Sequence, residues 1–394
     1  MDFALTEEQQ NYRTRLRAFF DEVASPAVVE EFDRIEIFPD EIYSKMADLG
    51  LTRLGLPEEF GGTRADEITL CLAIEEVARA SASLLYTWMP TVTFCGRGIA
   101  RFGTAEQKER LLRGICSGQI RMAMGLTEPR TGSDLSSLST SAVRDGDELV
   151  IDGHKTFTTG ADTADYILTL VRTETNTSPS RGLTMVLIPR HAVGVDITTK
   201  RKLSGQATHA CDVHFTGVRV PVANVLGTSG DGFRQILSLL DGERIYVGAE
   251  SAGIAQAALD MANDYAHTRV QFGKPIVEHQ AVAHLLANMA MDVRIARLTT
   301  WEAAWRLENG LPCSAEASMT KVIASEAATR CVSNGMQVLG GYSYITEYAM
   351  ERYWREVKLN EIAGGTNQIQ RNIIARHLSA MQDLADNPWR SALS

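Results

Sequence analysis

The sequence lacks the short motifs that most often mark a nucleotide-binding or hydrolytic site. No Gly-x-Gly-x-x-Gly follows a strand-like segment and no Gly-x-x-x-x-Gly-Lys-[Ser/Thr] occurs, which excludes a Rossmann fingerprint and a P-loop. A Gly-x-Ser-x-Gly elbow is also missing. There is no His-Glu-x-x-His, and the eight histidines do not cluster at metal-ligand spacing, so we expect no metal. Any cofactor must therefore be bound by a less common structural motif.

Positive charge is also scarce. The chain has 39 Lys and Arg against 49 Asp and Glu, a formal net charge of -10, and no dense basic run, which argues against nucleic-acid binding. No apolar run approaches the length of a membrane span. The acidic, amphipathic start MDFALTEEQQ resembles neither a secretory signal nor an Arg-rich transit peptide. The six cysteines are scattered without Cys-x-x-Cys, as expected for free thiols. We expect a cytoplasmic protein with no membrane span.

The hydrophobic content of 44% over 394 residues is enough for a sizeable core. Periodicity divides the chain into three blocks and predicts an α+β fold. Residues 1–121 are expected to be helical, because Leu70, Ile74 and Val77 recur three or four residues apart. Residues 229–394 are also expected to be helical. Their clearest helix starts near residue 282 and should end near Asn309-Gly310, and several such helices suggest a bundle.

The middle block, residues 122–228, has the pattern of short strands. Residues 148–151 and 154–159 flank Asp152-Gly153, which predicts a hairpin turn at that dipeptide. Further strands are expected at 166–171, 183–188 and 211–220, separated by turn-forming residues. The block therefore reads as an antiparallel sheet or small barrel.

Four segments carry candidate chemistry. LTEPRTGSDL (126–135) offers hydroxyls and exposed backbone N–H groups, and Arg269 in RVQFGKPIVEHQ (269–280) suits a phosphate. The paired glycines of QVLGGYSY (337–344) allow close approach to the backbone, and NEIAGGTNQIQR (360–371) looks like a loop entering a helix. Taken singly, each is more often a plain loop, a helix connection or a cap.

Taken together, the four segments resemble the acyl-CoA dehydrogenase family, and the similarity covers nearly the whole chain. Supporting segments are PEEFGG (57–62), DGHKTFTTGA (152–161), VRVPVANVLG (218–227) and GTNQIQRNIIARHL (365–378). The resemblance implies an N-terminal helical domain (1–121), a central antiparallel β domain (122–228) and a C-terminal four-helix bundle domain (229–394). It also implies an FAD-dependent oxidoreductase of fatty acid metabolism. Such an enzyme would act on CH–CH bonds of acyl-CoA as a homotetramer or homodimer and pass electrons to an electron-transfer flavoprotein.

The resemblance also assigns positions, residue by residue. Those matching the segment around the flavin ring are Met124, Leu126, Thr127, Ser133, Phe157 and Thr159. Those matching contacts to the rest of FAD, in part across a subunit interface, are Arg269, Phe272, Gln280, Gln337, Gly341, Thr366 and Gln368. Those matching positions near the thioester or its pantetheine arm are Ser133, Asp241 and Arg244.

The catalytic base is the point at which the sequence departs from the common family pattern. The reaction removes an α proton, and a desolvated carboxylate suits that task because burial raises its pKa. Relatives commonly carry this Glu in a Tyr-Glu-Gly-Thr loop, where the present chain has Gly364. Others carry it on a helix, in a segment like LLDGERIYVG (239–248), which places Glu243 in that role. We expect Glu243 to be the base and the Gly364 N–H to bind the thioester carbonyl.

Small residues at 363 and 364 predict a roomy acyl end, suited to a branched, cyclic or polar group. Two alternatives remain enzymes: a reductase like crotonobetainyl-CoA reductase, which has a similar Gly-Gly loop, or a dehydrogenase of carrier-protein thioesters. A third is a flavoprotein subunit without catalysis. Arg130 stands where most relatives have Gly, and we expect it to contact CoA phosphates or a polar acyl group.

Overall fold

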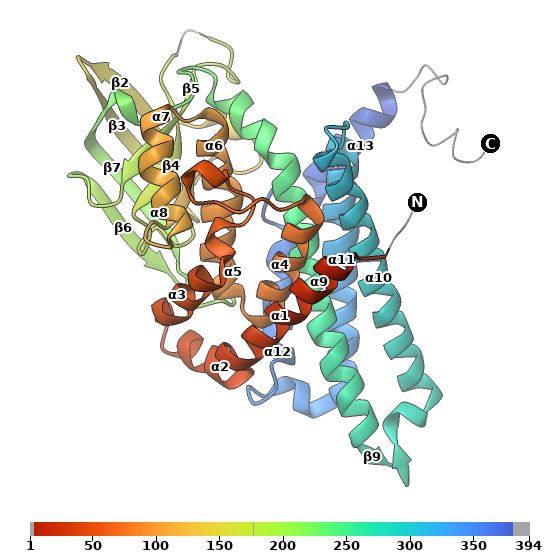
Figure 1. Ribbon diagram of the computed structural model, residues 1–394. Helices are drawn as coiled ribbons and strands as arrows, with labels where there is room; N and C mark the ends of the chain where they lie inside the picture. The colour runs from red at the N-terminus through yellow and green to blue at the C-terminus, as the bar shows by residue number, and fades with distance from the viewer. Residues whose placement is uncertain (1–3, 176, 381–394) are drawn as a thin grey trace.

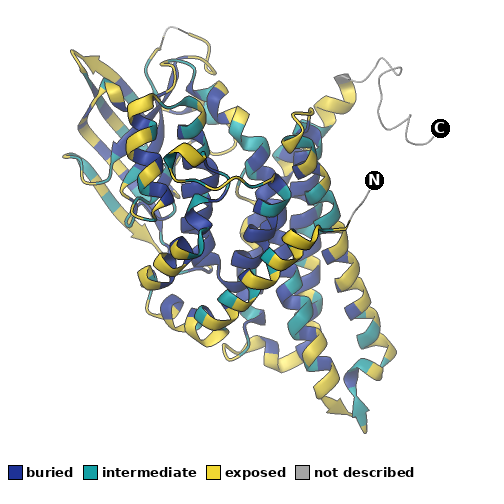
Figure 2. Ribbon diagram, viewed as in Figure 1, coloured by how far each residue is buried: buried dark blue, intermediate teal, exposed yellow. Residues whose placement is uncertain are grey.

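The computed structural model describes residues 4–175 and 177–380. It has helices at both ends of the chain and one main sheet between them in sequence (Figure 1). In Figure 1 the sheet lies at the left, the N-terminal helices lie in the middle and the long C-terminal helices lie at the right. Buried residues concentrate where the middle helices meet the long ones, as Figure 2 shows. No helix in the described ranges is both long enough and apolar enough to cross a membrane.

The N-terminal part consists of short helices, of which α5 is buried along its whole length and α4 along most of it. These helices are α1 (Glu7–Val23), α2 (Pro26–Arg34), α3 (Asp40–Leu49), α4 (Glu67–Ala80), α5 (Ala82–Met89), α6 (Arg97–Phe102), α7 (Ala105–Gln107) and α8 (Arg113–Cys116). The segment η3 (Pro90–Gly96) joins α5 to α6 as a π-helical stretch. Pro90 has no N–H to donate within the helix, which accounts for the irregular turn at this point.

The main sheet has the strand order β6-β7-β3-β2-β4-β5-β8, and β1 pairs with β4. Its strands are β1 (Met122–Gly125), β2 (Ser141–Asp145), β3 (Glu148–Lys155), β4 (Tyr166–Arg172), β5 (Leu183–Pro189), β6 (Val195–Lys200), β7 (Ala210–Pro221) and β8 (Val225–Leu226). Strands β4 and β5 are buried on both faces, as their continuous apolar runs predict. Most pairings are antiparallel, but β1 and β4 are parallel and a single parallel pair, Ser141 with Arg172, joins β2 to β4.

The predicted hairpin turn at Asp152-Gly153 is wrong. Strand β3 runs straight through this dipeptide, and the pairing with β7 shifts register between Ile151 and Gly153, as at a β-bulge. The turn lies instead between β2 and β3, where Gly146 has a φ of +62°. Strands β1, β2, β6 and β8 of this sheet were not predicted from the sequence. The strands expected at 166–171, 183–188 and 211–220 are confirmed to within one residue at each end.

The C-terminal part is a bundle of long helices. It contains α9 (Gly232–Thr268), α10 (Gln280–Glu308), α11 (Ser314–Leu339), α12 (Met350–Val357) and α13 (Asn367–Ala380). Helix α10 ends at Asn309-Gly310 as predicted. A two-stranded hairpin of β9 (Val270–Gln271) and β10 (Lys274–Pro275) projects from one end of the bundle (Figure 1).

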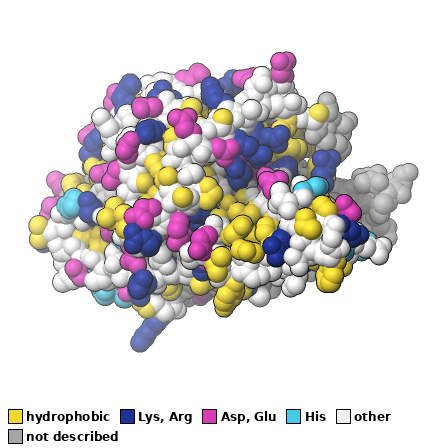
Figure 3. Space-filling model, turned by 90° about the horizontal axis from the view of Figure 1, so that it is seen from below, with side chains coloured by type: hydrophobic (Ala, Val, Ile, Leu, Met, Phe, Trp, Pro, Cys, Tyr) yellow, Lys and Arg dark blue, Asp and Glu magenta, His cyan; other side chains and the backbone are white. Residues whose placement is uncertain are grey.

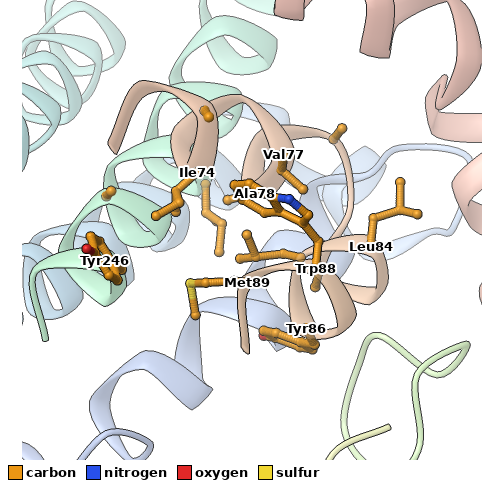
Figure 4. Close-up of a cluster of buried hydrophobic side chains, with 14 of the residues drawn as sticks. Ile74, Val77, Ala78, Leu84, Tyr86, Trp88, Met89 and Tyr246 are labelled. Atoms are coloured by element: carbon orange, nitrogen blue, oxygen red, sulfur yellow. The ribbon is translucent and has the colours of Figure 1, made fainter. Parts of the chain in front are cut away.

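A buried polar network fixes α9 against the N-terminal helices. The Tyr246 hydroxyl on α9 donates to Glu67 Oε2 of α4 at 2.7 Å. Arg97 of α6 donates to the same hydroxyl and forms an ion pair with Glu67 at 2.7 Å. Figure 4 shows Tyr246 at the edge of the apolar cluster around Trp88 and Met89. Because buried polar groups need partners, this network holds α9 in one position relative to α4.

Candidate active site

The loop that carries Gly364 packs against α9. Gly364 has a φ of +64°, and a Cβ added there would meet only Val247 Cγ2, at 3.8 Å. Val247 lies one helical turn after Glu243, so the loop and the expected base lie beside the same stretch of α9. No hydrogen bond from the Gly364 N–H is found within the described part of the chain. A backbone donor is therefore available next to α9.

Glu243 has the environment of a base. The residue is partly exposed as a whole, but its Oε2 is buried and has no hydrogen-bond partner among the described residues. Burial raises the pKa of Glu243 from 4.5 to about 7. Cys95 in η3 lies near Glu243. Burial is the main cause that raises the pKa of the Cys95 thiol, and the charge of Glu243 is the second. A carboxyl with this pKa can take up or release a proton near neutral pH.

A buried ion pair holds the loop that follows β1. Lys155 at the end of β3 is fully buried, and its Nζ donates to Glu128 Oε1 at 2.9 Å and to the Leu126 carbonyl at 3.2 Å. Glu128 also accepts from the Ser139 N–H and hydroxyl, both at 2.7 Å, and from the Thr140 N–H at 2.8 Å. Burial favours the neutral acid, but Lys155 and these donors lower the pKa of Glu128 to about 2.

Sequence reasoning treated Glu128 as part of a turn and did not single out Lys155. The sequence feature that could have indicated Lys155 is its place at an inward-facing position of a predicted strand, where an apolar side chain is usual. Beside this pair, the Thr156 N–H donates to the Thr127 carbonyl at 2.9 Å, so the segment of Thr127 lies next to the segment that leads to Phe157. Met124, Leu126 and Thr127 are half-buried along this segment, whereas Arg130 and Ser133 are exposed.

Phe157 lies two residues after Lys155, and its ring points outward. It has a φ of +54° and is 65% exposed, an arrangement that is costly for an aromatic residue without a bound partner. Lys200 Nζ lies 5.8 Å from its ring centroid. Thr159, two residues on, is half-buried. The exposed ring suits contact with a flat cofactor ring.

Next to Phe157, the sheet brings together three groups with metal-ligand chemistry. His154 on β3 and His214 on β7 are cross-strand partners with stacked rings, and Asp212 lies beside them. Their ligand atoms lie within 4.8 Å of one another. Spacing in sequence does not reveal this cluster, because strand pairing creates it. Here Asp212 holds the Lys200 ammonium at 2.9 Å and accepts from the Thr156 hydroxyl at 2.6 Å.

A cavity of about 560 Å³ lies near the end of the bundle that carries the β9–β10 hairpin. It is lined by Tyr265, Arg269, Gln271, Ile276, Val338, Leu339, Gly340, Gly341, Tyr342 and Ile345. A Cβ added at Gly340 or Gly341 would meet nothing within 4 Å, so a ligand can approach this backbone closely. Arg269 supplies a guanidinium, which suits the diphosphate of a dinucleotide. The structure thus brings Arg269 and Gly341 together.

The other expected cofactor residues lie around the bundle. Phe272 at the hairpin tip is 95% exposed with a φ of +52°, and Gln337 and Gln280 are exposed on α11 and at the start of α10. Thr366 and Gln368 lie at the start of α13, where the Thr366 hydroxyl accepts from the Ile369 N–H at 3.3 Å. Seen from the hairpin end, hydrophobic side chains gather on the surface (Figure 3).

Of the positions expected near the thioester, two are paired on α9. Arg244 is buried, and its Nη1 donates to Asp241 Oδ1 at 2.7 Å. Both flank Glu243 in sequence, whereas Ser133 lies on an exposed loop of the β region. Among the described residues, no hydrogen bond or ion pair joins Ser133 to this pair. The pair would place a charged group at the edge of the Glu243 site.

Comparison with known proteins follows the three-part organisation of the chain. Residues 6–119 match the family model of the acyl-CoA dehydrogenase N-terminal domain, residues 123–218 that of the middle domain and residues 230–379 that of the C-terminal domain. A probable acyl-CoA dehydrogenase, YngJ, of Bacillus subtilis is 39% identical over 96% of this chain and 100% of its own length. Acryloyl-CoA reductase (NADH) of Anaerotignum propionicum is 36% identical over 96% of each chain. The solved butyryl-CoA dehydrogenase of Megasphaera elsdenii superposes with a TM-score of 0.92 at 33% identity, covering 96% of this chain and 100% of that one.

Proposed function

The chain belongs to the acyl-CoA dehydrogenases, FAD-dependent oxidoreductases that act on CH–CH bonds, and we propose that Glu243 is its catalytic base. The observation that carries this proposal is the buried Oε2 of Glu243, which has no partner among the described residues. It lies one helical turn from Val247, the side chain that a Cβ at Gly364 would meet. The proposed reaction is α,β-dehydrogenation of an acyl-CoA whose acyl group is branched, cyclic or polar.

The residues present fit FAD. Arg269 and the open backbone at Gly340 and Gly341 suit its diphosphate, and the outward ring of Phe157 suits its isoalloxazine. FAD, when bound, supplies the acceptor for the β hydrogen, which leaves the substrate as hydride. We propose the remaining contacts at the positions that match the family, among them Thr127 and Thr366.

The chain's own groups handle the proton and the carbonyl. In the proposed step the Glu243 carboxylate takes the α proton, and its burial raises its basicity for this transfer. The Gly364 N–H donates to the thioester carbonyl, which acidifies the α carbon and stabilises the enolate-like charge. Tyr246 and its partners hold α9 so that the carboxylate does not swing away from the loop. The small side chains at 363 and 364 leave room for the acyl group.

Anaerobic reduction of the flavin by acyl-CoA tests the assignment of the base. The Glu243→Gln variant should bind FAD normally, with the usual flavin absorption, yet lose bleaching by substrate by at least about a thousandfold. Glu302→Gln, which removes an exposed carboxyl on α10, is the control and should retain bleaching within about tenfold. Rapid bleaching of Glu243→Gln would show that another group removes the proton.

The reverse reaction is a second candidate, because a relative with 36% identity is named an acryloyl-CoA reductase. The same groups would serve, with Glu243 donating the α proton. Assays with a saturated acyl-CoA and with its 2-enoyl form, each with the matching electron carrier, separate the two directions. We further propose domains at 1–121, 122–228 and 229–394, a cytoplasmic homotetramer or homodimer and an electron-transfer flavoprotein as electron acceptor.

A further inference from the structure

Away from α9, strands β3 and β7 bring two imidazoles and a carboxylate to one face of the sheet. His154 on β3 and His214 on β7 are cross-strand partners, and their ring centroids lie 3.9 Å apart. Asp212 lies two residues before His214 on β7, and side chains two residues apart on a strand share a face. The ligand atoms of the three side chains lie within 4.8 Å of one another. Imidazole nitrogens and a carboxylate oxygen are ligands that Zn²⁺ accepts in proteins.

The β-bulge in β3 creates this arrangement. On the N-terminal side of the bulge Ile151 pairs with Val218, and that register, if continued, would place His154 opposite the buried Phe215. After the bulge, His154 pairs with His214 instead. Directly paired residues share a face of the sheet, so the extra residue moves the His154 side chain to the face of His214.

The carboxylate and one imidazole are already oriented for a shared ion. The Thr156 hydroxyl donates to Asp212 Oδ1 at 2.6 Å, and the other oxygen, Oδ2, lies 3.4 Å from His154 Nε2. This nitrogen is buried and has no hydrogen-bond partner among the described residues. Two ligands of a tetrahedral Zn²⁺ ion lie about 3.4 Å apart, because each is about 2.0–2.2 Å from the metal. The separation of Asp212 Oδ2 and His154 Nε2 therefore fits a common metal ion.

The Lys200 ammonium competes for the same carboxylate. It lies 2.9 Å from Asp212 Oδ2, but the Lys200 side chain is 43% exposed and its flexible stem can move into solvent. The cross-strand partner of His214 on β6 is Asp196, so a second carboxylate adds negative charge to this face. Exchange of Lys200 for a divalent ion keeps the charge of Asp212 compensated and gives His154 Nε2 a partner.

We propose that His154, Asp212 and His214 bind a divalent transition-metal ion of the Zn²⁺ type, in exchange for the Lys200 ammonium. Two nitrogens and one oxygen favour Zn²⁺ over Mg²⁺ and Ca²⁺, which prefer oxygen ligands. The ion joins β3 to β7 beside the bulge, where the register of the strand pairing shifts. The proposal replaces the expectation of no metal that sequence spacing gives, and it does not depend on the proposed dehydrogenase reaction.

Zn²⁺ binding to the FAD-loaded protein, without an affinity tag, tests the proposal. In competition with a chromogenic chelator, the wild type should bind one Zn²⁺ ion per chain. His154→Gln and Asp212→Asn should each weaken binding at least tenfold. His191→Gln removes an exposed histidine of the same part of the chain outside the cluster, so it is the matched control and should change the affinity less than twofold. The six cysteines are buried free thiols and should not compete for the ion.

Lys200→Met supplies a variant in which affinity should increase. It removes the cation that competes for Asp212, so Zn²⁺ should bind at least threefold more tightly. Unchanged or weaker binding would refute the exchange of Lys200 for the ion. Thermal unfolding gives a second readout, because a ligand of the folded state raises Tm. Zn²⁺ should raise the Tm of the wild type but not that of His154→Gln, and the same concentration of Mg²⁺ should raise neither.

Two results would overturn the site itself. Equal Zn²⁺ affinity in the wild type, His154→Gln and Asp212→Asn would assign the ion to other groups. Failure of the wild type to take Zn²⁺ from the chelator would show that the three side chains do not form a metal site. Neither result bears on the proposed function, which is tested by reduction of the flavin with acyl-CoA and by Glu243→Gln.

Discussion

Replacing Lys155 with Met tests whether its buried ion pair with Glu128 positions the loop that follows β1, where we propose that the flavin binds. Met matches the length of the lysine stem but cannot donate to Glu128 Oε1 or to the Leu126 carbonyl. Glu128 would remain a buried carboxylate with its charge uncompensated. Removing one partner of a buried ion pair typically costs about 3–5 kcal/mol. Glu128 keeps its donors from Ser139 and Thr140, so we expect the low end, about 3 kcal/mol.

Urea unfolding of the FAD-saturated protein measures this loss directly. Arg219→Met in the same sheet is the control, because Arg219 pairs with Asp145 and Glu148 at the surface. Losing these surface ion pairs should lower the free energy of unfolding by less than about 1 kcal/mol. The double variant Lys155→Met with Glu128→Leu should recover most of the stability, since neither charge is then left unpaired.

A positioning role for the pair also predicts a change in the cofactor itself. Lys155→Met should shift the flavin absorption bands or visible circular dichroism and weaken FAD binding at least tenfold, whereas Arg219→Met should do neither. A purely structural pair would lower stability without moving the flavin spectrum. An unchanged free energy of unfolding in Lys155→Met would contradict the energetic argument, and an unchanged spectrum would contradict the positioning argument.

Three further predictions follow from charged side chains in the site. In the dehydrogenation direction kcat/KM should rise about tenfold per pH unit below pH 7 and level off above it, because Glu243 must be ionised; a flat pH profile would argue against this base. Glu243→Gln should be more stable than the wild type at pH 8 by up to about 3 kcal/mol, but not at pH 4. The pKa of Glu243 in the folded protein, about 7, lies above its value of 4.5 in the unfolded chain. The wild type therefore loses folding free energy as the pH rises from the unfolded pKa to the folded pKa. Arg269→Ala should weaken FAD binding by at least tenfold, measured by flavin release during dilution, whereas Arg294→Ala on the exposed face of α10 should not.

The sequence predicted the helices well because their signals are local. The last turn of α10 leads into Asn309 and Gly310, where the helix was expected to end. The wrong hairpin at Asp152-Gly153 has a different cause. Asp-Gly favours both a tight turn and a bulge, and only the pairing of β3 with β7 decides between them. Pairing with a distant strand is not visible in a local pattern.

Burial of charged residues was the other limit. On α4, the spacing of Leu70, Ile74 and Val77 predicts one apolar stripe, and that pattern does not show whether Glu75 and Glu76 are buried. Both glutamates are buried, and they pair with arginines from α10 and from α1. The same limit applies to Lys155, whose sequence context looks ordinary. Its significance depends on the distant side chain that pairs with it, Glu128, and that information exists only in three dimensions.

A base carried by α9 has a physical consequence that a base on the Gly364 loop would not have. The loop contains two glycines with positive φ, Gly364 and Gly365, and such backbone is mobile unless other groups hold it. Gln370 Nε2 provides some restraint by donating to the carbonyls of both glycines at 3.0 Å. Glu243, in contrast, lies in the middle of a helix that Tyr246 ties to α4. This arrangement places the Glu243 carboxylate on a rigid helix and leaves only the Gly364 N–H donor on the loop. The loop can therefore adapt to different acyl groups without displacing the base.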